Sequence, residues 1–164
     1  MKRSSTIFLQ AVIVLVGVVA LAIMIRFPLT EGRAVNLDLF SIYADPFIMY
    51  GYLASIAFFV SLYQAFKLLG LIGQHKAFSL NSVRALRIIR YCAIILSISI
   101  VMAALYIRIF HATDDDPAGF IALAILATFI SIVIATAASV FEKILQSAVI
   151  IHFARTFFER KLDE

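Results

Sequence analysis

Four long apolar runs dominate this chain, over residues 7–25, 46–66, 91–107 and 118–140, and none of them contains Asp, Glu, Lys, Arg or His. A helix needs about 20 apolar residues to cross a hydrocarbon core of about 30 Å, because each residue adds about 1.5 Å. Backbone polar groups in lipid must be hydrogen-bonded within the protein, which favours helices. The sequence therefore predicts an all-α, polytopic membrane protein with four transmembrane helices arranged as two hairpins.

The composition supports this class. The chain has 164 residues, of which 63% are hydrophobic and 15% charged. A soluble domain has about 45–50% apolar and about 25% charged residues, and a core of this size could not bury the excess. We expect one membrane domain over residues 1–149 and a cytoplasmic tail over residues 150–164. The single cysteine, Cys92, excludes an intrachain disulfide and a multi-cysteine metal site.

The distribution of cations predicts the orientation of the spans. Residues 67–90 contain five Lys or Arg and no Asp or Glu. Cytoplasmic loops carry an excess of Lys and Arg, which places this segment inside. With that loop inside, eleven of the 14 Lys and Arg are cytoplasmic, and only Arg26, Arg33 and Arg108 lie outside. We expect both termini in the cytoplasm.

Capping residues mark the expected helix starts. Asp45-Pro46 and Asp116-Pro117 each place a good N-cap before a proline, which is tolerated at the first helical position. Ser79, Asn81 and Ser82 are N-cap candidates before the third span. Apolar residues recur at helical spacing in the tail, which predicts an amphipathic C-terminal helix. It either continues the fourth span or lies on the membrane surface.

The absence of ionised residues from the four spans limits the chemistry of this protein. Proton relays and ion paths in membranes use embedded charged residues, so a proton-coupled antiporter is disfavoured. There is no HExxH motif for a metalloprotease. His111 beside Asp114, Asp115 and Asp116 is the one candidate for catalysis or metal binding, and a solvated acidic turn explains these residues better. We expect no enzyme, no catalytic residue, no metal and no cofactor.

Two sets of residues are candidates for binding or packing. The cations of the central loop could bind anionic lipid headgroups or a cytoplasmic protein partner; they are Lys76, Arg84, Arg87 and Arg90. Small side chains at successive i+4 positions let helices approach closely in lipid; they are Ala127, Ser131, Ala135 and Ser139. This face could pack within the bundle, join two copies in a homo-oligomer, or line a ligand groove.

Residues 73–90 resemble the central loop of a family of uncharacterised four-span bacterial membrane proteins, a domain of unknown function. The resemblance rests on a glycine, a Phe-Ser pair, an asparagine and a Leu-Arg pair between spans two and three; here these are Gly73, Phe78, Ser79, Asn81, Leu86 and Arg87. Members are often encoded beside a small helix-turn-helix regulator, which implies a transcription factor as partner. The resemblance implies no catalytic residue. This chain departs from the family in its tail, which continues as Ile150-Ile151-His152-Phe153.

These observations give two hypotheses for function. The first is a non-enzymatic regulatory or scaffolding protein of the bacterial cytoplasmic membrane. It would bind a partner through its cytoplasmic basic loop and tail. The alternative is a small transporter or channel subunit that works as an oligomer. No pattern in the sequence indicates direct binding of nucleic acid.

Overall fold

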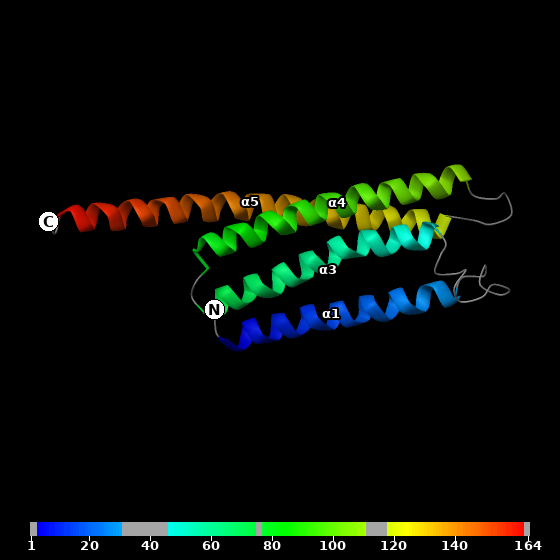
Figure 1. The fold of residues 1–164 in the computed structure, drawn as a ribbon, viewed down its shortest axis with the longest axis horizontal. Coiled ribbons are helices and arrows are strands. Elements are labelled where there is room, and N and C mark those ends of the chain that lie inside the picture. The colour runs from blue at the N-terminus through cyan, green and yellow to red at the C-terminus, as the bar shows by residue number, and fades with distance from the viewer. Residues whose placement is uncertain (1–2, 31–45, 75–76, 111–117, 163–164) are drawn as a thin grey trace.

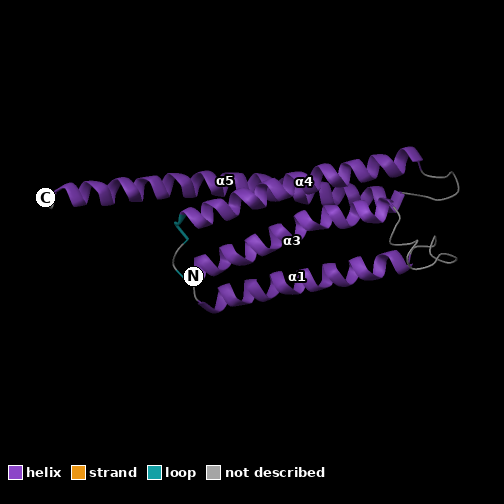
Figure 2. Cartoon of the chain, in the orientation of Figure 1, coloured by secondary structure: helices purple, strands orange, loops and turns teal. Residues whose placement is uncertain are grey.

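The structure, a computed structural model, describes residues 3–30, 46–74, 77–110 and 118–162. They form four helices, α1 (Arg3–Thr30), α3 (Pro46–Gly73), α4 (Leu80–Phe110) and α5 (Ala118–Leu162). Each helix is long and apolar enough to cross a membrane. Figure 2 shows only helices and short loops in the described part of the chain. The predicted all-α, four-span architecture is confirmed.

The helices run antiparallel and follow chain order across the bundle (Figure 1). Helix α4 packs along α5, α3 packs against α4, and α1 packs against α3. The start of α1, the end of α3, the start of α4 and the C-terminal part of α5 therefore lie at one end. We call this the basic end, because it carries most of the described cations: Lys67, Arg84, Arg87, Arg90, Lys143, Arg155 and Lys161.

Helix α4 is the central element of the bundle. It supplies most of the buried apolar side chains among the described residues, namely Val83, Ala85, Leu86, Ile89, Cys92 and Ala93. Leu86 and Ile89 contact Ala138 of α5, and residues of α3 and α5 surround this cluster. Along the rest of the bundle large apolar side chains face outward, as expected for helices whose solvent is lipid.

Ser79, one of the three candidates Ser79, Asn81 and Ser82, is the N-cap of helix α4. Its hydroxyl oxygen accepts a hydrogen bond from the backbone N–H of Ser82 at 3.3 Å, and its carbonyl accepts one from Val83 at 3.2 Å. These bonds satisfy N–H groups that have no partner within the first turn of a helix. Asp45, Asp116 and Pro117, which form the other two predicted caps with Pro46, lie outside the described residues.

Helix α1 continues past its expected span and includes Pro28. Proline has no N–H, so the carbonyl of Met24, four residues earlier, loses its usual helical donor. The Tyr52 hydroxyl of α3 donates a hydrogen bond to that carbonyl at 3.2 Å. The proline is thus accommodated because a neighbouring helix supplies the missing donor.

Glycines bring α1 and α3 together at the basic end and near the middle of the two helices. A Cβ atom at Gly73 would lie 3.0 Å from the Thr6 side chain, and one at Gly17 would lie 3.0 Å from the Leu62 side chain. Such close approach increases contact between helices where lipid provides no hydrophobic drive.

Helix α5 has 45 residues. At about 1.5 Å per residue it is about 68 Å long, more than twice the thickness of a hydrocarbon core. Figure 1 shows its C-terminal part projecting beyond the start of α4. The tail therefore continues the fourth span as one helix in this structure.

Candidate functional site

The side chains of greatest chemical interest lie where α4 and α5 meet at the basic end. Arg87 and Arg90 are three residues apart on α4 and so share one face. Arg87 Nε lies 2.7 Å from Glu142 Oε1, and Arg90 Nη1 lies 3.0 Å from Glu142 Oε2. We call these three residues the Arg–Glu–Arg triad.

Glu142 is the buried member of the triad. Its side chain is 5% exposed, whereas those of Arg87 and Arg90 are 49% and 24% exposed. The Arg87 contact is a directed hydrogen bond. The Arg90 contact is an ion pair without hydrogen-bond alignment, since Oε2 has no hydrogen-bond partner. A buried carboxylate is tolerated only when paired, and here it meets two cations.

Sequence reasoning missed Glu142, because this residue lies just beyond the fourth apolar run at residues 118–140 and belongs to neither set of candidate residues. The spacing between Glu142 and the apolar residues of the fourth helix could have revealed it. Glu142 follows Ala138 by four residues, precedes Leu145 by three and precedes Val149 by seven, all on one helical face. Ala138 and Val149 are buried and Leu145 packs against the core. An acidic residue in such a row predicts a buried ion pair.

The candidate cations differ in whether they form an ion pair. Arg87 and Arg90 are held on Glu142, while no described residue forms an ion pair with Arg84. Arg84 is exposed and lines a groove of about 490 Å³ between α4 and α5, with Leu80 and Ile150 at its end. Lys76 lies outside the described residues.

The C-terminal part of α5 presents five large exposed apolar side chains. Three of them, Ile150, Phe153 and Phe157, form a row on the helix face beside this groove, and the other two lie on a different face. Between 62% and 68% of the surface of each of the five is exposed; they are Ile150, Ile151, Phe153, Phe157 and Phe158. A second groove, of about 430 Å³, lies between Phe78 and Phe153. The fold thus brings Arg84, the start of α4 and the apolar tail to one surface, which we call the tail surface.

The small-residue face of the fourth span is half-buried. This holds for all four of its residues, Ala127, Ser131, Ala135 and Ser139. Ala135 and Ser139 line a groove between α4 and α5, with Ser97 and Arg90 on the α4 side. One end of this face therefore borders a cavity at membrane depth.

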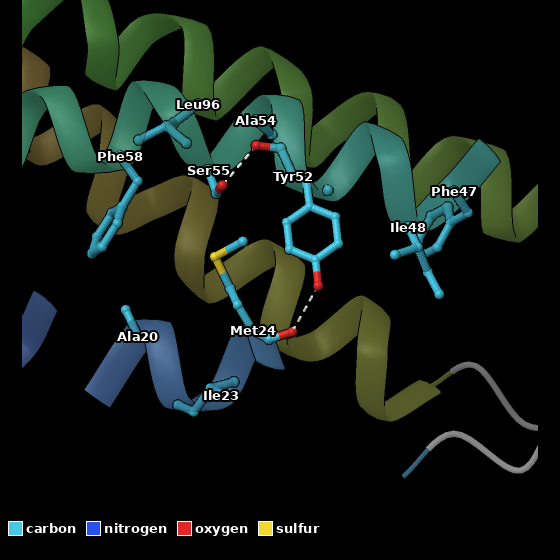
Figure 3. A pocket seen from close by; sticks show the side chains of 11 residues that line it. Ala20, Ile23, Met24, Phe47, Ile48, Tyr52, Ala54, Ser55, Phe58 and Leu96 are labelled. Carbon is cyan, nitrogen blue, oxygen red and sulfur yellow. Dashed lines mark hydrogen bonds between the residues drawn. The ribbon is translucent and has the colours of Figure 1, made fainter. Parts of the chain in front are cut away.

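A separate cavity of about 450 Å³ lies between α1 and α3 (Figure 3). Its walls are apolar, and the ring of Tyr52 crosses it toward Met24. The hydroxyls of Tyr52 and Ser55 are both committed to backbone carbonyls, of Met24 and Tyr52 respectively. The lining therefore offers hydrocarbon contact and no free reactive group.

Among the described residues, no three His, Cys, Asp or Glu side chains come together in a way that could hold a metal ion. His111 and the Asp residues at 114–116 lie outside the described part of the chain.

Comparison with known proteins identifies the family. A family model described as "Protein of unknown function (DUF2975)" matches residues 29–152. The uncharacterized membrane protein YoaS of Bacillus subtilis (strain 168) is 40% identical over 152 residues, which cover 91% of this chain and 94% of that protein. No solved structure matches the chain. Together with the four membrane-length helices, the match over most of its length shows that this chain belongs to the DUF2975 family of membrane proteins of unknown function.

Proposed function

We propose that the protein is a non-enzymatic regulatory or scaffolding protein of the bacterial cytoplasmic membrane that holds a cytoplasmic protein partner on its tail surface. Both termini are cytoplasmic in this proposal. The observation that carries it is the row of large apolar side chains on α5 that remains exposed beyond the Arg–Glu–Arg triad.

Helix α5 is long enough for this row to lie beyond the membrane, in water. About 20 residues of the helix, from Ala118 to about residue 138, suffice to cross the hydrocarbon core. Phe153 and Phe157 lie 11 and 15 residues beyond Glu142, which is about 16 and 22 Å along the axis. Contiguous apolar side chains exposed to water mark interaction sites, because covering them is favourable.

The positive charge of Arg84 indicates that the partner carries an acidic group. Arg84 is part of the tail surface, and it forms no ion pair with any described residue. A helix or groove with apolar side chains and a carboxylate opposite Arg84 would complement this surface. The family resemblance implies a small helix-turn-helix regulator as this partner.

Site-specific photo-crosslinking in intact cells tests the proposal. A benzophenone amino acid at position 157 should capture one cytoplasmic protein, and the same probe at position 129, on the exposed face of the membrane-spanning part of α5, should capture none. Phe153→Ser with Phe157→Ser should abolish capture by a probe at position 80, which borders both grooves and leaves Arg84 in place. The matched variant with Leu at both positions should retain it, because Leu preserves the apolar surface.

Arg84→Gln should weaken co-purification of the captured protein at least severalfold, whereas Lys143→Gln, an exposed cation on α5 outside the groove, should not. The proposal is wrong if the Ser pair and Arg84→Gln both leave capture and co-purification unchanged. Arg87 and Arg90 are unsuitable for this test, because their removal also changes the surroundings of buried Glu142.

A further inference from the structure

The groove between α4 and α5 on the membrane side of the Arg–Glu–Arg triad has the form of an amphiphile site. Its volume is about 400 Å³, within the range of about 300–1,000 Å³ typical of small-molecule sites. Arg90 lies at one end, and the walls include Ala93, Ser97, Ile98, Ile132, Ala135 and Ser139.

Small side chains keep this groove open. Four of the lining side chains are small, Ala93 and Ser97 on α4 and Ala135 and Ser139 on α5, which leaves space between the two helices at these positions. Ile94, Ile98 and Ile132 complete the apolar walls. The groove opens to the side of the bundle, where the surrounding medium is hydrocarbon. An apolar chain entering it would gain van der Waals contact on two sides, which is the main attraction available in lipid.

Arg90 gives the groove a charged end. Its guanidinium carries five N–H donors, and the ion pair to Glu142 engages Nη1. The guanidinium also lies 4.9 Å from the centre of the Tyr91 ring. The side chain is 24% exposed, so donors remain accessible. The triad holds two cations against one carboxylate and keeps a net positive charge.

We propose that this groove binds one acyl chain of an anionic phospholipid, with the lipid phosphodiester on Arg90. Ile98 lies eight residues beyond Arg90, which is about 12 Å along α4. One leaflet contributes about 15 Å of hydrocarbon, half of a core of about 30 Å. Basic pockets between transmembrane helices are suited to anionic headgroups, and the groove supplies the adjoining space for the chain.

Charge and depth favour this occupant over the other candidates. A free phosphate would meet Arg90 but leave the apolar part of the groove empty. A second copy of the chain would need a carboxylate at this depth, and its four apolar runs contain none. Glu142, the acidic residue at this level, is buried within its own bundle.

Native mass spectrometry of the purified, delipidated chain in detergent tests the proposal. Phosphatidylglycerol should bind as a single adduct that survives mild activation, and phosphatidylcholine with the same acyl chains should bind at least tenfold more weakly. Arg90→Gln should weaken the phosphatidylglycerol adduct about tenfold, the factor expected from losing one charge-assisted contact. Lys143→Gln, which removes an exposed cation close to the triad but outside the groove, should leave binding unchanged.

A second variant keeps the test decisive if Arg90→Gln does not fold. Ser97→Phe preserves every charge and fills the groove, so it should abolish the adduct while circular dichroism shows the same helix content. The proposal fails if Ser97→Phe binds like the parent chain, if both lipids bind equally, or if Lys143→Gln weakens binding as much as Arg90→Gln. It also fails if inorganic phosphate at the lipid concentration displaces the adduct. None of these readouts depends on the protein partner proposed above.

Discussion

Replacing both Arg87 and Arg90 by Gln should destabilise the protein more than replacing those two residues together with Glu142. In the double variant the carboxylate of Glu142, which is 5% exposed in the parent protein, loses both cations. In the triple variant Glu142→Gln removes that charge. A third substitution should therefore restore stability, although it removes one more polar contact of the parent protein.

The expected magnitude follows from the burial of each partner. Stranding a buried charge costs about 3–5 kcal/mol, whereas replacing a whole buried ion pair by neutral residues is often close to neutral. The lower value applies here, because Arg87 is 49% exposed and its replacement admits water to the carboxylate. We expect a loss of about 3 kcal/mol for the double variant and about 1 kcal/mol for the triple variant.

Unfolding in mixed micelles of a mild detergent and dodecyl sulfate, followed by circular dichroism, measures these free energies. The control is Arg84→Gln with Lys143→Gln, which removes two cations outside the triad and should cost less than about 1 kcal/mol. A triple variant as unstable as the double variant would refute the reasoning.

Two further predictions concern the contact between α1 and α3. Tyr52→Phe should cost about 1–2 kcal/mol, since it strands a carbonyl that Pro28 leaves without a donor, while Tyr50→Phe should cost about 0.6 kcal/mol or less; equal losses in the same unfolding assay would contradict the role of the proline. Gly73→Ala should cost about 1–3 kcal/mol, because its Cβ would lie 3.0 Å from the side chain of a buried threonine. Gly51→Ala meets nothing within 4 Å and should stabilise α3 by about 0.5–1 kcal/mol, so a loss at Gly51 would count against the packing described.

The sequence alone determined the features that depend on local composition and spacing. Apolar runs of membrane length predict the four helices whatever their neighbours are, because a spanning segment must satisfy its own backbone. The cap at Ser79 is likewise local, since its hydroxyl serves the turn that follows it. The predicted orientation rests on the same kind of information, the excess of Lys and Arg in residues 67–90, and it stays a prediction.

Tertiary structure decided which face of each helix meets which neighbour. In a soluble protein the polar face of a helix reveals its buried face, but a helix surrounded by lipid is apolar on every side. By sequence alone, therefore, Arg84, Arg87 and Arg90 are equivalent cations. The fold pairs two of them with Glu142 and leaves Arg84 on the surface, because only the packing of α4 on α5 determines which cations lie beside the carboxylate.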